Sequence, residues 1–213
     1  MPRVGVCDYG VGNLRSVERA LRVAGAEPVI SGDPNVIVAC DGVVLPGVGA
    51  FSVAARALWD TGLGTAVLEL AQAERPVLGI CLGHQLLFEG SDEGQGGEGL
   101  ALLRGHVVKL ASSGGLKVPH IGWNTITKVR ESTLLAGIPS GSFMYFVHSY
   151  VAVPDPDDAL AITEYGAELA VAVQRDNVMG TQFHPEKSGA SGLRVYANFV
   201  SLCAVRVPAQ RAG

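Results

Sequence analysis

Short apolar runs alternate with segments of helical periodicity in the first half of the chain. The apolar runs predict buried strands at residues 4–7, 28–30, 42–45 and 76–80. Apolar residues at helical spacing predict helices at residues 14–24, 54–73 (with a break near Thr61-Gly62) and 84–89. Because strands that alternate with helices build βαβ units, this half predicts a mainly parallel sheet with helices on both faces.

The second half is rich in strand patterns and has few helical ones. We expect strands at residues 102–110, 124–130, 143–147, 159–164 and 169–174, loops at 90–99 and 112–115, and a closing helix at 191–204. These strands would extend the parallel sheet in antiparallel fashion. The predicted fold is an open, mainly parallel α/β sheet flanked by helices with an antiparallel extension, in which residues 1–213 form a single domain.

The composition argues against several classes of partner. The chain has 213 residues, 48% of them hydrophobic, and a net charge of -4. These values suit a globular domain and give no electrostatic footprint for nucleic acid or anionic lipid. The longest stretch without Asp, Glu, Lys or Arg, residues 132–154, contains prolines, glycines and His148, so no membrane span is expected. No long apolar segment typical of a signal peptide opens the chain, so we expect a cytoplasmic protein.

The sequence contains no pattern that indicates a metal site or a bound cofactor. Its four cysteines form no Cys-x-x-Cys pair, and neither a His-Glu-x-x-His motif nor a complete glycine-rich phosphate loop is present. Cys7, Cys40 and Cys203 lie in apolar runs and are interpreted as small buried hydrophobic residues. We therefore expect neither a metal site nor a bound cofactor.

Residues 79–83, Gly-Ile-Cys-Leu-Gly, stand between a predicted strand and a predicted helix. This is the pattern of a nucleophile elbow, in which Cys81 would occupy a sharp, strained turn. Gly79 and Gly83 fit because a side chain at either position would collide with neighbouring backbone. The helix that follows would favour the thiolate through its N-terminal N–H groups. The alternative is an ordinary buried cysteine at the end of a strand.

A nucleophilic cysteine needs a base, and of the five histidines His184 has the most informative context, Gln182-Phe-His184-Pro-Glu186. Pro185 keeps the chain out of a helix, and residues i and i+2 of an extended backbone point to the same side. Glu186 can therefore orient the His184 imidazole, which completes a Cys–His–Glu triad. Alone, the His-Pro-Glu tripeptide would be weak evidence.

Acyl chemistry at a thiol also needs donors for an oxyanion. Pro46-Gly-Val-Gly49 follows a predicted strand and so lies at the carboxyl edge of the sheet, where ligands bind in such folds. Its glycines allow backbone N–H groups to approach a substrate closely, and the N–H of Leu82 would be a second donor. Taken by itself, the segment would be interpreted as an ordinary turn before a helix.

Together these motifs resemble the class I glutamine amidotransferases, which have a flavodoxin-like fold. The resemblance rests on residues 79–85 and 184–186 and covers essentially the whole chain. Four more segments are similar to the glutaminase subunits of imidazole glycerol phosphate synthase, which act in histidine biosynthesis; they are residues 8–13, 46–51, 119–124 and 145–150. One departure is Ser149, where that group has threonine, and the hydroxyl is kept.

The resemblance implies a hydrolytic reaction on L-glutamine. Cys81 would attack the side-chain amide, His184 would protonate the departing ammonia, Glu186 would orient His184, and water would hydrolyse the glutamyl thioester. The residues implied to hold glutamine are Gly47, Gly49, Gln85, Ser149 and Tyr150, and the implied oxyanion donors are Val48 and Leu82. We expect the Val48 N–H to turn toward the oxyanion only in an active state.

The resemblance also implies a partner, a separate cyclase subunit with a (β/α)8 barrel that forms a heterodimer with the glutaminase. Ammonia would pass to it and convert the phosphoribulosyl intermediate PRFAR into imidazole glycerol phosphate and AICAR. Asn13, Trp123, Tyr145 and Lys187 match positions that face this partner. Two of these residues have alternative structural interpretations of equal weight: Trp123 could be a core residue, and Lys187 could be a solvated charge.

Three other functions remain open at this point. The chain could be the glutaminase subunit of another amidotransferase, serving anthranilate, pyridoxal phosphate or purine synthesis. It could be a free-standing cysteine hydrolase that is fully active without a partner. It could also be a binding module without catalysis, in which case Cys81→Ala would change nothing measurable.

Overall fold

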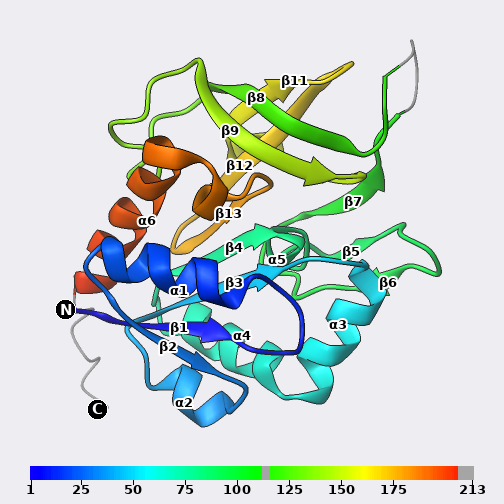
Figure 1. The fold of residues 1–213 in the computed structure, drawn as a ribbon. Coiled ribbons are helices and arrows are strands. Elements are labelled where there is room, and N and C mark those ends of the chain that lie inside the picture. The colour runs from blue at the N-terminus through cyan, green and yellow to red at the C-terminus, as the bar shows by residue number, and fades with distance from the viewer. Residues whose placement is uncertain (112–115, 206–213) are drawn as a thin grey trace.

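The computed structural model describes residues 1–111 and 116–205, so the turn expected at 112–115 lies outside the described residues. The described chain forms a nine-stranded mixed sheet in the order β2-β1-β3-β4-β13-β12-β11-β8-β9 and a smaller sheet in the order β10-β7-β5-β6. Figure 1 shows the large sheet with helices packed along its first half.

The first half of the large sheet is parallel and the second half is antiparallel. The parallel strands are β1 (Arg3–Cys7), β2 (Glu27–Ser31), β3 (Gly42–Gly47), β4 (Val77–Cys81) and β13 (Val178–Thr181). The antiparallel strands are β12 (Glu168–Arg175), β11 (Ala159–Glu164), β8 (His120–Lys128) and β9 (Ser142–His148). The predicted fold class, an α/β sheet with an antiparallel extension, is therefore confirmed.

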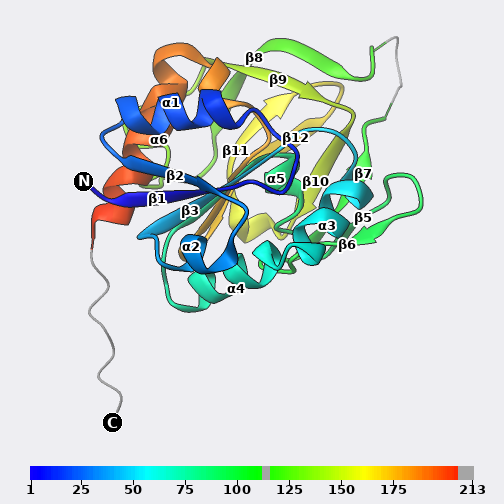
Figure 2. The same ribbon diagram turned by 60° about the horizontal axis from the view of Figure 1, so that its bottom comes forward.

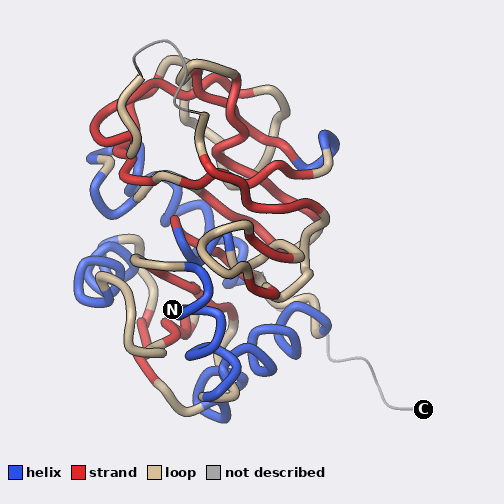
Figure 3. Tube along the Cα trace, turned by 90° about the vertical axis from the view of Figure 1, so that its right-hand side faces the viewer, coloured by secondary structure: helices blue, strands red, loops and turns tan. Residues whose placement is uncertain are grey.

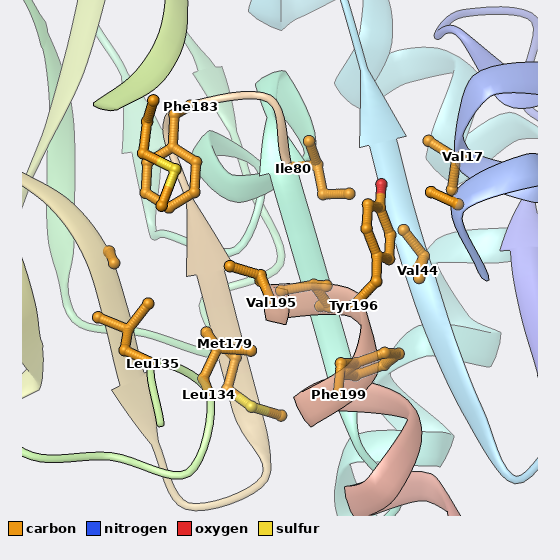
Figure 4. Close-up of a cluster of buried hydrophobic side chains, with 14 of the residues drawn as sticks. Val17, Val44, Ile80, Leu134, Leu135, Met179, Phe183, Val195, Tyr196 and Phe199 are labelled. Atoms are coloured by element: carbon orange, nitrogen blue, oxygen red, sulfur yellow. The ribbon is translucent and has the colours of Figure 1, made fainter. Parts of the chain in front are cut away.

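Helices cover the two faces of the parallel strands, as Figure 2 shows. One face carries α1 (Leu14–Val23) and α6 (Gly189–Ala204), and the other carries α2 (Pro34–Val38), α3 (Phe51–Asp60) and α4 (Leu63–Gln72). Alternate strand residues serve the two layers, since Val44 packs with the first group and Val43 and Leu45 with the second. In Figure 4, Tyr196 and Phe199 of α6 lie over Val44 and Ile80 of the sheet.

The smaller sheet packs on the same side as α3 and α4. Its strands are β5 (Gly90–Ser91), β6 (Gly97–Glu98), β7 (Gly105–Lys109) and β10 (Tyr150–Pro154). Val107 of β7 and Ala152 of β10 belong to the same buried cluster as Phe51 and Leu58 of α3. In the trace of Figure 3, the strand-rich second half forms one end of the molecule.

Several local predictions were wrong. The helix expected at 84–89 is the single turn α5 (Leu82–Gln85), and the segment expected to be a loop at 90–99 contains the short strands β5 and β6. The segment at 102–110 belongs to the smaller sheet and not to the extension. The sequence did not predict α2, β10 or β13. Each of these elements spans only four or five residues, too short for a clear periodicity.

Candidate active site

Cys81 is the last residue of β4 and stands where the strand turns into α5. Its backbone has φ +54° and ψ -108°, a conformation that non-glycine residues rarely adopt. Gly79 and Gly83 make the turn possible. A Cβ at Gly83 would lie 1.7 Å from the Leu45 carbonyl oxygen, and one at Gly79 would lie 2.6 Å from the Gly83 carbonyl oxygen. The strained elbow predicted from the sequence is confirmed.

His184 reaches the same edge of the sheet from β13. Because β13 pairs with β4 in parallel and Thr181 lies opposite Ile80, the chain that leaves β13 passes beside Cys81. The His184 N–H donates to the Tyr145 carbonyl oxygen over 3.0 Å. The Ser188 hydroxyl donates to the His184 carbonyl oxygen over 2.6 Å, so the backbone of His184 is held on both sides.

Glu186 lies in the short 3-10 turn η2 (Pro185–Lys187) and faces His184. Its Oε1 is 2.7 Å from His184 Nδ1, and both side chains are at least 97% buried. Burial lowers the pKa of His184, but its contacts with Cys81 and Glu186 outweigh that effect and raise the pKa to about 9. At neutral pH the imidazole is therefore held as imidazolium, with Nδ1 facing Glu186.

A cavity of about 310 Å³ opens onto Cys81 and His184. Most of the predicted substrate and oxyanion residues line it, namely Val48, Gly49, Leu82, Gln85, Ser149 and Tyr150. Glu186 lies behind His184 and does not line the cavity. The structure therefore brings the carboxyl ends of β3 and β4, the single turn α5 and the connection between β9 and β10 around one space.

Gly47 is the one predicted binding residue that does not line this cavity. It pairs with Cys81 across β3 and β4. A Cβ there would lie 2.8 Å from the Tyr9 hydroxyl and 2.9 Å from the Gly83 nitrogen. Gly47 thus permits close packing beneath the elbow, and Tyr9, whose hydroxyl donates to the Pro46 carbonyl oxygen, supports the same segment.

Gly49 has φ +102°, a conformation that favours glycine, and a Cβ there would meet nothing within 4 Å. The neighbouring Val48 side chain is 42% exposed. The 48–49 segment is therefore held by little packing, which fits a loop whose peptide can reorient.

Sequence reasoning missed four polar residues around the cavity. Glu93 lines it, and its Oε2 accepts from the Phe51 N–H at the start of α3 over 2.7 Å. His148 also lines it, and His120 and Gln182 lie behind. Glu93 comes from the loop to which no role was given. Gln182 stands two residues before His184 in the motif given above, but its contact with Cys81, like the contact between His148 and His120, depends on strand pairing, which no local motif encodes.

His120 and His148 form a directed chain of hydrogen bonds. The Tyr150 carbonyl oxygen can only accept, so His148 Nδ1, 2.9 Å away, carries the proton. His148 Nε2 then accepts from His120 Nδ1 over 3.1 Å, and His120 Nε2 accepts from Asn124 Nδ2 over 3.4 Å. Burial lowers the pKa of His120, and burial likewise lowers the pKa of His148 to about 4, so both rings are neutral, as this chain requires.

Three of the four predicted partner-facing residues are exposed, and Tyr145 is half-buried. Trp123 is 56% exposed, which rules out the core interpretation, and its ring packs at 6.0 Å against Tyr145. Lys187 Nζ lies 5.6 Å from the centre of the Tyr145 ring. Asn13 is exposed directly before α1, a helix that contacts η2. Trp123, Tyr145 and Lys187 thus form one patch, which we call the aromatic patch.

Within the described residues, neither the other cysteines nor the metal-ligating side chains form a second site. Cys7, Cys40 and Cys203 are buried, and burial raises the pKa of each thiol, to about 12 for Cys203. Within residues 1–111 and 116–205, no three His, Cys, Asp or Glu side chains are grouped so that they could hold a metal ion. In the same residues no helix is long and apolar enough to cross a membrane.

Comparison with known proteins agrees with this geometry. The sequence model of the family "Glutamine amidotransferase class-I" matches residues 5–202. Relatives named imidazole glycerol phosphate synthase subunit HisH include that of Methanosarcina mazei, 50% identical over 95% of this chain and 100% of its own length. The corresponding protein of Moorella thermoacetica is 49% identical over 95% of this chain and 96% of its own.

Solved structures support the fold. A crystal structure titled glutamine amidotransferase has a TM-score of 0.74 at 20% identity, covering 95% of this chain and 99% of that one. A structure of PurLQS from Thermotoga maritima has a TM-score of 0.72 at 21% identity, covering 94% and 98%.

The chain therefore belongs to the class I glutamine amidotransferases, and its α/β architecture is the fold of that family. Within the family it groups with the glutaminase subunits named imidazole glycerol phosphate synthase subunit HisH.

Proposed function

We propose that the chain hydrolyses L-glutamine to glutamate and ammonia as the glutaminase subunit of imidazole glycerol phosphate synthase. The observation that carries this proposal is the assembly of a strained cysteine, a raised-pKa histidine and a buried glutamate at one cavity. Those three groups supply a nucleophile, a proton carrier and the charge that stabilises its imidazolium form. The names of the relatives supply the biosynthetic context.

In the first half of the reaction, the Cys81 sulfur attacks the amide carbon of glutamine and the oxyanion forms. Val48 and Leu82, which line the cavity together with Cys81, offer their backbone N–H groups to that oxygen. The carbon–nitrogen bond then breaks, and His184 gives its proton to the departing ammonia.

In the second half, His184 takes a proton from water as the water oxygen attacks the thioester carbon. The carbon–sulfur bond breaks, glutamate leaves, and the sulfur regains its negative charge beside the imidazolium. The sum is glutamine and water giving glutamate and ammonia, so no oxidant, metal or cofactor is required.

Substrate binding falls to the groups that line the rest of the cavity. Gln85 donates from Nε2 to the Tyr150 carbonyl oxygen over 2.9 Å, which holds the amide and leaves Oε1 to accept from the glutamine amino group. Gly49, Ser149 and Tyr150 border the same space and offer backbone and hydroxyl groups. Gly47 contributes indirectly, since it lets β3 approach the elbow.

The partner in this proposal is the (β/α)8 cyclase subunit, which forms a heterodimer in the cytoplasm and uses the ammonia to convert PRFAR. The exposed aromatic patch and Asn13 are the surface that we assign to it. Tyr145 connects that patch to the triad, because its carbonyl oxygen accepts the His184 N–H. Partner binding there can therefore alter the position of His184.

The decisive experiment is Cys81→Ala assayed together with the cyclase subunit. Synthesis of imidazole glycerol phosphate from glutamine should disappear, while synthesis from added ammonium should persist. Loss of both would show a structural role for Cys81. Glutaminase rates measured with and without the cyclase and its ligand then test the dependence on the partner, and equal rates would point to a free-standing hydrolase.

A further inference from the structure

Gln182 contacts the sulfur of Cys81 from inside the protein. Its side chain is fully buried, and its Nε2 lies 3.8 Å from Cys81 Sγ, within reach of an N–H···S hydrogen bond. Gln182 does not line the cavity, so this contact is not available to a substrate. Packing alone does not explain why a buried amide donates a hydrogen bond to a cysteine sulfur.

The neighbouring residues fix which end of the Gln182 amide faces the sulfur. Gln85 Nε2 lies 2.9 Å from the Tyr150 carbonyl oxygen, a group that can only accept. The same Nε2 lies 3.0 Å from the Gln182 amide, so the atom that it meets must be the acceptor, Oε1. The Gln182 NH₂ group is then forced to point at Cys81, and the opposite orientation would break the bond to Gln85.

This chain of hydrogen bonds, from the Tyr150 carbonyl oxygen through Gln85 to Gln182, is anchored in the rigid part of the site. The Tyr150 carbonyl oxygen also accepts from His148 Nδ1 over 2.9 Å, so it receives donors from Gln85 and from His148. The Gln182 backbone N–H donates to the Val171 carbonyl oxygen over 2.9 Å. Gln182 therefore cannot turn away from the sulfur without breaking bonds that run through two strands.

We propose that Gln182 is a catalytic residue whose Nε2–H stabilises the negative charge on the Cys81 sulfur, both as the attacking thiolate and as the leaving group of the thioester. The proposal rests on Cys81 being the nucleophile. The donor is neutral and is not consumed, so it serves the sulfur whether His184 carries its proton or has given it to ammonia. A hydrogen bond to a charged atom is stronger than one to its neutral form, so the contact favours the anion.

The test uses a readout that does not depend on glutaminase activity, the rate of alkylation of Cys81 by iodoacetamide as a function of pH. His184 and Tyr9 are titratable groups that face Cys81, and both are kept in every variant. Gln182→Met keeps the side-chain length and removes the donor. We expect its alkylation midpoint to move up by about one pH unit and kcat/KM for glutamine to fall about tenfold.

Gln174→Met is the matched control, because Gln174 donates to the Asp176 carbonyl oxygen over 2.9 Å on β12 and lies outside the site. It should leave the midpoint unchanged, and Cys81→Ala should abolish the labelling. A folded Gln182→Met with the wild-type midpoint overturns the proposal.

If Gln182→Met does not fold, the near-isosteric Gln182→Glu serves instead. Its carboxylate should raise the midpoint at least as far, and an unchanged midpoint overturns the proposal equally. Failure of the proposed function would be seen separately, as glutaminase activity that survives Cys81→Ala.

Discussion

Oε1 of Glu186 lies 2.7 Å from Nδ1 of His184, and both side chains are almost completely buried. The carboxylate fixes which ring nitrogen carries a proton and stabilises the imidazolium. Glu186→Gln keeps the shape and removes the charge. We therefore expect kcat for glutamine hydrolysis to fall about 10²- to 10⁴-fold, while synthesis from ammonium in the complex is unchanged.

The control for this substitution is Glu131→Gln, because Glu131 is an exposed carboxylate that pairs only with Lys128 among the described contacts. It should have wild-type kinetics. A Glu186→Gln enzyme with wild-type kcat would remove Glu186 from the catalytic machinery.

Gly83→Ala should prevent the elbow from forming. The added Cβ would lie 1.7 Å from the Leu45 carbonyl oxygen, which is backbone of a central strand and cannot move aside. We expect a loss of about 4 kcal/mol or more in the free energy of unfolding, measured by urea titration. Gly94→Ala is the control, because a Cβ at Gly94 meets nothing within 4 Å. Equal stabilities of the two variants would contradict the packing argument.

Gly49→Ala tests whether the proposed oxyanion loop needs the backbone freedom of glycine or only the space that glycine leaves. Since a Cβ at Gly49 meets nothing within 4 Å, any loss of activity reports the preference for φ +102° and not a collision. We expect the variant to fold and kcat in the complex to fall about 10²-fold, the size of losing one oxyanion donor. Gly94→Ala again serves as control, having positive φ in open space. Unchanged kcat would mean that the loop needs no glycine there.

The parts of this site that the sequence predicted are those encoded by local spacing. Gly79, Cys81 and Gly83 fall within five residues, and His184 and Glu186 are two residues apart, so steric and extended-chain arguments reach them directly. The resemblance to known amidotransferases supplied the rest of the predicted set.

Gln182, His148 and His120 were missed for a physical reason. Their contacts depend on β13 lying next to β4 and on the register that places His120 opposite His148 in β8 and β9. β13 is only four residues long and was not predicted, so the position of Gln182 beside the sulfur could not be inferred. Long-range strand pairing, and not residue type, is what makes these residues part of the site.

Stability against acid should depend on His84 and His148. Burial lowers the pKa of His84 to about 3 and that of His148 to about 4, from 6.5 for an unfolded histidine. The unfolded chain therefore binds more protons than the folded chain between these values, and the free energy of unfolding falls as pH drops below about 6.5. Each histidine contributes about 1.4 kcal/mol per pH unit until its folded-state pKa is reached.

His148→Asn should remove one of these two contributions, so urea midpoints measured from pH 7 to pH 4.5 should fall less steeply than for the wild type. His106→Asn is the control, because His106 is exposed and pairs with Asp92 at 2.8 Å.

Between pH 6.5 and 9 the free energy of unfolding changes with pH in the opposite direction, because His184, with its pKa raised to about 9, binds its proton more tightly in the folded state. Stability that His184 contributes is therefore lost as pH rises through 9, and Glu186→Gln should make that alkaline limb less steep, because Cys81 and Glu186 together raise the His184 pKa.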